Sequence, residues 1–141
     1  MNLLQLNWLA IVVAFVAFFA IGAIWFGPKT FYPVWVRALG KDPQEGPRGL
    51  PMPLVFGLTA LGALVQVVTT AIVIHFVSAA SGAVGALGGA GIGLLLGVGI
   101  AAAASLSHRL FASQGLKVWI IEVGNDIVAL TVAGLIIGIF G

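Results

Sequence analysis

Two carboxylic acids, Glu122 and Asp126, interrupt a long apolar run near the end of the sequence. They are four residues apart, so on a helix they lie on the same face. An ionised carboxyl group inside a membrane is costly unless it is paired or wetted, and such groups mark proton and cation paths. We therefore expect both acids to face the interior of a helix bundle or a water-filled cavity.

Polar residues elsewhere in the sequence are candidate partners for these acids. The candidate intramembrane polar site consists of Asp126, Glu122, Asn125, Gln66, Ser105 and Arg109. In one interpretation the site is a structural clamp, in which Arg109 or Lys117 holds Glu122. Asp126 then forms hydrogen bonds with Gln66, Asn125 or Ser105. In the other interpretation the two acids form a proton- or cation-responsive site.

Other combinations of reactive side chains carry less information. The sequence has no Cys and two His, His75 and His108, which the expected helices place at opposite ends, so no metal site is predicted. Ser105, His108 and Glu122 match no catalytic-triad motif. Six Lys and Arg are too few for a nucleic-acid footprint. We expect no enzyme activity, no cofactor and no nucleic-acid partner.

The elements that position the acids follow from composition. Of 141 residues, 7% are charged and 61% are hydrophobic, whereas about a quarter of the residues in a soluble domain are charged. Four apolar runs each reach the roughly 20 residues that a membrane-crossing helix needs. The predicted fold is an all-α integral membrane bundle of four transmembrane helices in one domain, over residues 6–27, 53–78, 88–108 and 118–140.

The connections between these runs differ in character. The loop 28–52 is expected to begin with a short interfacial helix over 28–39, where bulky apolar groups alternate with Lys29 and Arg37. A Gly- and Pro-rich linker follows it. A turn is expected within the weakly polar stretch 79–87.

The basic residues predict the orientation. They all lie in the first and third connections: Lys29, Arg37, Lys41, Arg48, Arg109 and Lys117. Four spans place those two connections on the same side, and Lys and Arg are enriched in cytoplasmic loops. We expect a multi-pass protein of the bacterial cytoplasmic membrane with both termini outside.

The third run carries a ridge of small residues at intervals of four: Gly89, Gly93, Gly97, Ala101 and Ser105. Such residues lie on one helix face and allow another backbone to approach closely. The ridge therefore serves either packing within the bundle or the interface of a homo-oligomer.

Short aromatic and glycine motifs recur along nearly the whole chain. They are Asn7-Trp8-Leu9-Ala10, the segment Gly22 to Pro28, Trp35 with Arg37-Ala38-Leu39-Gly40, Leu116 to Ile121 leading to Gly124, and a late Gly134. In this order and spacing they resemble the bacterial family of small membrane proteins catalogued as domain of unknown function 1761. The resemblance implies a four-span fold and no established activity.

Two functional hypotheses remain. The first is a small transport or permeation protein with an intramembrane acidic site, whose ion or small-molecule substrate the sequence does not identify. The second is a non-catalytic membrane protein that self-associates, or packs against a partner, through the ridge on its third span. In both, the lipid bilayer is the surrounding partner.

Overall fold

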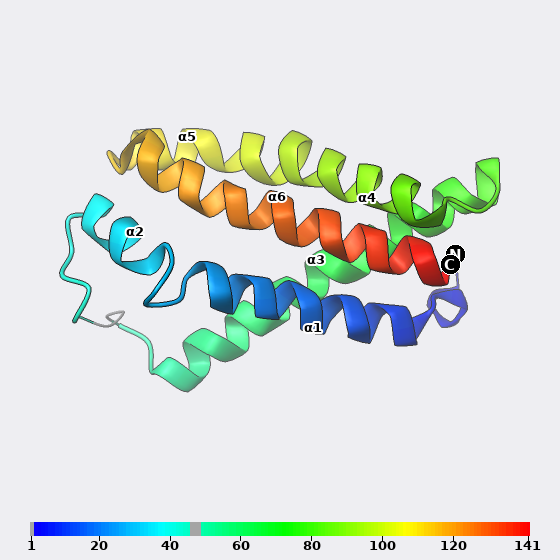
Figure 1. Ribbon diagram of the computed structural model, residues 1–141, viewed down its shortest axis with the longest axis horizontal. Coiled ribbons are helices and arrows are strands. Elements are labelled where there is room, and N and C mark those ends of the chain that lie inside the picture. The colour runs from blue at the N-terminus through cyan, green and yellow to red at the C-terminus, as the bar shows by residue number, and fades with distance from the viewer. Residues whose placement is uncertain (1, 46–48) are drawn as a thin grey trace.

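The computed structural model describes residues 2–45 and 49–141, which form helices and connecting turns without a strand (Figure 1). The elements in chain order are the 3₁₀ turn η1 (Leu3–Gln5), α1 (Trp8–Trp25), α2 (Tyr32–Ala38), α3 (Met52–Ser81), α4 (Gly85–Leu96), the π-helical segment η2 (Gly97–Ala102), α5 (Ala103–Phe111) and α6 (Gly115–Phe140). The segments α4, η2 and α5 form one continuous rod. Within the described residues, four helices are thus long and apolar enough to cross a membrane: α1, α3, this rod and α6. The predicted fold class is confirmed.

Two helix ends differ from expectation. The turn expected within 79–87 is shorter, because α3 continues to Ser81 and α4 already begins at Gly85. Ala and Ser in this stretch continue the helix, and the chain turns where Gly82 has a φ of 88° and Gly85 a φ of 69°. Positive φ angles of this kind are accessible to glycine at little cost. The third helical rod also extends to Phe111, so Arg109 lies within its last turn rather than in a loop.

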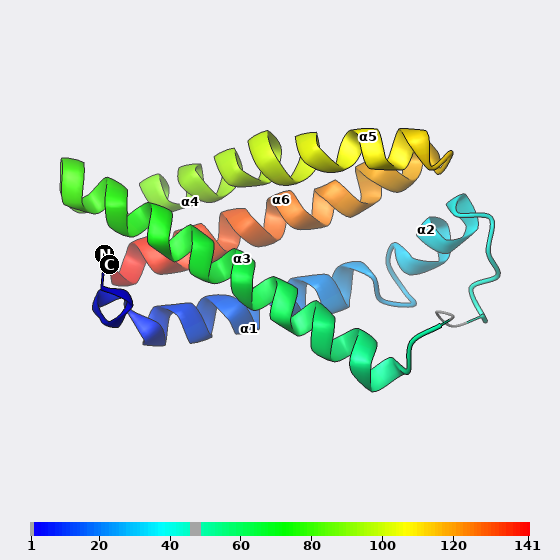
Figure 2. The same ribbon diagram turned by 180° about the vertical axis from the view of Figure 1, so that it is seen from behind.

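The helix α6 lies at the centre of the bundle and contacts every other α-helix. The two chain termini lie together at one end, which we call the terminal end (Figures 1 and 2). There Asn7 caps α1 by accepting a hydrogen bond from the Ala10 amide at 3.0 Å. Its side-chain amide also donates to the Phe140 carbonyl oxygen at 3.3 Å, which links the start of α1 to the end of α6.

The opposite end of the bundle, which we call the basic end, carries α2 and the first and third connections. The basic residues of these connections cluster there in the structure, except that Arg48 lies outside the described residues. The sequence prediction that all cations share one end therefore holds for the described ones.

The α4–α6 interface is the closest packing in the bundle. A Cβ atom added at Gly89 would collide with the Gly134 carbonyl oxygen, and one added at Gly93 would collide with the Leu130 carbonyl oxygen. One added at Gly97 would lie 2.9 Å from the Ile127 Cα atom. The ridge glycines thus pack backbone to backbone within the chain, as small residues do between membrane helices.

The helix α3 packs against the bundle along only part of its length. One of its faces carries a stripe at spacings of three and four: Met52, Phe56, Thr59, Ala63, Val67, Thr70 and Ile74. From Ala63 onward this stripe is buried, whereas Met52 is 44% and Phe56 56% exposed. In both views the first turns of α3 diverge from α6 toward the basic end (Figures 1 and 2).

Candidate intramembrane polar site

The helix α6 holds both acids on one stripe, together with alanines that face the core. Ala129 and Ala133 on this stripe are fully buried in the core cluster that also contains Ala63 and Val67 of α3. Glu122 and Asp126 lie on the same stripe nearer the basic end, and both are half-buried. The acids therefore lie where the packing between α6 and α3 becomes incomplete.

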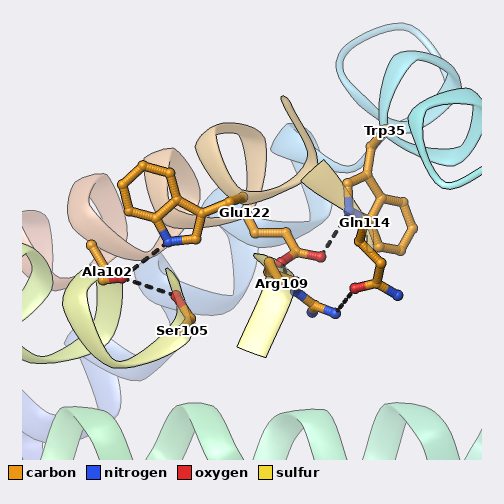
Figure 3. A network of polar contacts seen from close by, with 7 residues as sticks. Trp35, Ala102, Ser105, Arg109, Gln114 and Glu122 are labelled. Carbon is orange, nitrogen blue, oxygen red and sulfur yellow. Dashed lines mark hydrogen bonds and ion pairs between the residues drawn. The ribbon is translucent and has the colours of Figure 1, made fainter. Parts of the chain in front are cut away.

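Glu122 is held by two donors from two other helices. The Arg109 Nε atom donates to one carboxylate oxygen at 2.6 Å, and the Trp35 Nε1 atom donates to the other at 3.0 Å (Figure 3). The guanidinium group also donates to the Gln114 side-chain oxygen at 2.5 Å. Hydrogen bonds in which both groups are charged are the strongest of this class. Arg109 thus neutralises Glu122 and fixes its position. Lys117, the other expected partner of Glu122, is exposed.

Trp35 and Gln114 are site residues that the sequence reasoning missed. Trp35 lies on α2, where its ring packs edge-on against Phe26 with centroids 5.3 Å apart. A signal was present, because an indole N–H on an amphipathic helix needs an acceptor when it is drawn into a bundle. No spacing rule, however, connects residue 35 with residue 122.

Asp126 forms fewer and longer hydrogen bonds than Glu122. Its carboxylate accepts one long hydrogen bond, from the side-chain amide of its neighbour Asn125 at 3.4 Å. Of the other expected partners, Ser105 donates instead to the Ala102 carbonyl oxygen at 3.2 Å. Among residues 2–45 and 49–141, neither Gln66 nor any basic residue forms a hydrogen bond with Asp126. The structure brings Asn125 to Asp126, and it leaves Gln66 and Ser105 apart from it.

Asn125 itself contains an unsatisfied acceptor. Its side chain is buried, with 9% exposed, and its Oδ1 atom has no hydrogen-bond partner in the described part of the chain. This oxygen faces Gly22 of α1, where an added Cβ would lie 3.9 Å away. Because an unpaired buried polar atom costs free energy, the α1–α6 contact contains a weak point next to Asp126.

Two further tryptophans attach neighbouring helices to α6. Trp25 Nε1 donates to the Ile121 carbonyl oxygen at 2.9 Å, and its ring covers Gly124, where a Cβ would lie 2.8 Å from the ring. Trp119 Nε1 donates to the Ala102 carbonyl oxygen at 3.0 Å. The aromatic and glycine motifs of the sequence therefore act as helix-to-helix contacts.

The π-helical segment explains why the small-residue ridge does not continue as expected. After Gly97 the buried position is Ala102, five residues later, and Ala101 is only half-buried. A π turn has i→i+5 hydrogen bonds, so it moves the face toward α6 by one residue. The expected ridge members Ala101 and Ser105 are rotated away from the line of the glycines, and Arg109 is rotated toward Glu122.

The described part of the chain contains no cluster of side chains suited to bind a metal ion. There, no three His, Cys, Asp or Glu residues come close enough to hold a metal ion. A separate cavity of about 100 Å³ lies at the terminal end between residues 5–7, which precede α1, and the helices α3 and α6, lined by His75 and Ser78 among others. It is remote from Asp126, because it is bordered by the last turns of α3 and α6.

The fold and the site together define a small helical membrane protein with one clamped and one unclamped acid. A family model described as "Protein of unknown function (DUF1761)" matches residues 9–138, and the chain belongs to this family. No curated protein and no solved structure matches the chain. The resemblance seen in the sequence motifs is thus confirmed.

Proposed function

We propose that the protein is a small transport or permeation protein in which Asp126 is the cation- or proton-responsive group. The observation that carries the proposal is the contrast between the two acids of α6. Glu122 is neutralised by Arg109 at 2.6 Å, whereas Asp126 has no cation beside it among the described residues and one amide contact at 3.4 Å. Ionisable side chains within membrane spans are rare and commonly mark proton or cation paths.

The packing of α3 supports a route to Asp126. Ala63, where the stripe of α3 becomes buried, and Asp126 each lie eleven residues after the first residue of their helices. Toward the basic end from this level, the same face of α3 is exposed at Phe56 and Met52. Asp126 therefore lies at the level where the packing of α3 opens toward the basic end.

Glu122 and Arg109 have a separate role in this proposal. Their ion pair stands between Asp126 and the basic end of α6, together with Trp35 from α2. Since the pair is neutral as a whole, it holds α2 and α5 against α6 without presenting a fixed charge to a passing cation. This is the structural clamp, and it leaves Asp126 as the responsive residue.

Flux measurements in reconstituted vesicles test the proposal. Vesicles with an imposed proton, Na⁺ or K⁺ gradient are compared for the parent, for Asp126→Asn, and for Asp42→Asn as a control that removes an acid from the linker. We expect flux in the parent and the control, and flux at the level of empty vesicles for Asp126→Asn. A parent without flux, or an Asp126→Asn variant as active as the parent, would overturn the proposal.

We also propose that the basic end faces the cytoplasm of a bacterial cell, with both termini outside. Its support is the gathering of Lys and Arg in the first and third connections. Because the chain has no Cys, a single cysteine at Gln44 can be labelled selectively. We expect an impermeant thiol reagent to label it only after the cells are opened. Labelling in intact cells would reverse the orientation and leave the role of Asp126 unaffected.

A further inference from the structure

A groove of about 400 Å³ runs between α2 and α6 at the basic end. It is lined by Phe31, Val34, Lys117, Ile120 and Ile121, and we call it the α2–α6 groove. Its volume lies within the range of roughly 300–1,000 Å³ that is typical of small-molecule sites. The groove lies on the outside of α6, apart from the polar site around Asp126.

The walls of this groove are held in place by contacts already described. Phe31 packs against Trp25, with ring centroids 4.7 Å apart. Val34 lies on α2, which the hydrogen bond from Trp35 to Glu122 fixes to α6. Ile121 forms the floor and is 8% exposed, and its carbonyl oxygen accepts the hydrogen bond from Trp25. The groove is therefore a built feature of the fold rather than a chance gap between mobile side chains.

The lining combines an apolar trough with one cation. Phe31, Val34 and Ile120 are 41%, 38% and 58% exposed, and each presents hydrocarbon. Lys117 is the only charged residue of the lining. Among the residues that the structure describes, no acid pairs with it, since Arg109 takes Glu122.

The order of these groups along α6 matches the order of groups in a phospholipid. Lys117 lies in the first turn of α6, and Ile120 and Ile121 lie one turn deeper. A Lys in the first turn of a span extends its ammonium group to the headgroup level, while its stem and the next turn remain in hydrocarbon. Basic residues at this level attract anionic lipids.

We infer that the α2–α6 groove binds one anionic phospholipid. A stretch of its acyl chain lies on Phe31, Val34 and Ile120, and its phosphate lies near the Lys117 ammonium group. The charge of Lys117 distinguishes an anionic lipid from a zwitterionic one, and the apolar trough distinguishes a lipid from a free anion. This inference does not depend on the proposed transport function.

Tryptophan quenching by brominated lipids tests the inference, since three of the four Trp residues lie near this end. The full chain is placed in nanodiscs of phosphatidylcholine with a graded fraction of phosphatidylglycerol, and either lipid carries the bromine on its acyl chains. We expect the parent to bind phosphatidylglycerol more tightly than phosphatidylcholine. We expect Lys117→Gln to lower that preference about fivefold, the effect of one basic residue near a membrane surface.

Two matched variants localise the effect. Lys41→Gln removes the same charge from the linker at the same end, and we expect it to leave the lipid preference unchanged. Val34→Phe fills the trough without adding a tryptophan, and we expect it to reduce quenching by both lipids. Circular dichroism confirms that each variant retains its helix content.

Four outcomes would overturn the inference. Equal binding of both lipids by the parent would show that the groove has no anionic preference. An equal loss in Lys41→Gln and Lys117→Gln would assign the preference to overall charge. Unchanged quenching by both lipids in Val34→Phe would remove the groove from the interaction. A parent dimer that Val34→Phe converts to a monomer, seen by light scattering, would assign the groove to a second copy of the chain.

Discussion

The two ends of α6 are held against the neighbouring helices by different interactions. Toward the terminal end, α6 and α4 touch backbone to backbone at Gly89 and Gly93. Toward the basic end, α6 is held by side chains that cross between helices, namely Trp25, Trp35 and Arg109. In lipid, burial of apolar surface drives helices together only weakly, so close packing and hydrogen bonds must do it. Close packing holds the helices together at the terminal end, and hydrogen bonds hold them together at the basic end. Asp126, the acid without an ion pair to Arg109, lies between these two regions.

The largest effect is expected where backbones touch. Gly93→Ala places a methyl group against the Leu130 carbonyl oxygen, and backbone cannot move aside as a flexible side chain can. We expect a loss of about 3 kcal/mol in the free energy of unfolding, at the upper end of the range for overpacking. Titration with SDS in mixed micelles measures it.

Gly91→Ala is the matched control, because a Cβ at Gly91 meets no atom of the described residues within 4 Å. It should leave the stability unchanged or raise it by up to about 1 kcal/mol through helix propensity. Equal losses in the two variants would mean that the α4–α6 contact is looser than the structure indicates.

We expect a smaller difference in stability between variants on either side of the point where α3 diverges from the bundle. Ile74 and Phe56 lie on the same stripe of α3, but Ile74 is 3% and Phe56 56% exposed. We expect Ile74→Ala to cost about 2 kcal/mol, since it opens a void in the core. Phe56→Ala should change the stability by no more than about 0.5 kcal/mol, as is usual for an exposed site. The same unfolding titration applies, and a cost at Phe56 as large as at Ile74 would show that the stripe is packed along its whole length.

The smallest effect concerns the unpaired oxygen beside Asp126. Gly22→Ser supplies a hydroxyl group opposite Asn125 Oδ1, to which the added Cβ lies within van der Waals distance at 3.9 Å. A new hydrogen bond to a buried acceptor should make this variant about 1 kcal/mol more stable than Gly22→Ala, which adds the same Cβ without a donor. The comparison is again made by thermal or SDS unfolding. A serine variant no more stable than the alanine variant would mean that the oxygen is already satisfied, for example by water.

The sequence predicted those features that depend on composition and local spacing. Four spans followed from four long apolar runs, and the shared face of Glu122 and Asp126 followed from their separation by four residues. Arg109 was a candidate partner for Glu122 because the third and fourth helices form a hairpin with a short turn. These inferences required only helical geometry and the thickness of a bilayer.

The remaining features depend on tertiary contacts that no local pattern encodes. The divergence of α3 before Ala63 leaves no sequence signal, because its residues are apolar on both sides of that point. The hydrogen bond from Trp35 to Glu122 joins residues 87 positions apart. The shift from Ala101 to Ala102 arises from a π turn, which a regular spacing of four in the sequence could not predict.

That π turn determines which side chain meets Glu122. In an unbroken α-helix the residue three turns beyond Gly97 is His108, eleven positions later, because a turn takes 3.6 residues. With one extra residue accommodated in η2, the position is filled by Arg109. If the same residues formed a regular helix, an imidazole would meet the carboxylate in place of the guanidinium group. Deleting one residue within 98–101 would remove the π turn but keep Arg109 at this position, because Arg109 would then lie eleven residues after Gly97. The π turn thus determines that a permanently charged guanidinium group, rather than an imidazole, meets Glu122.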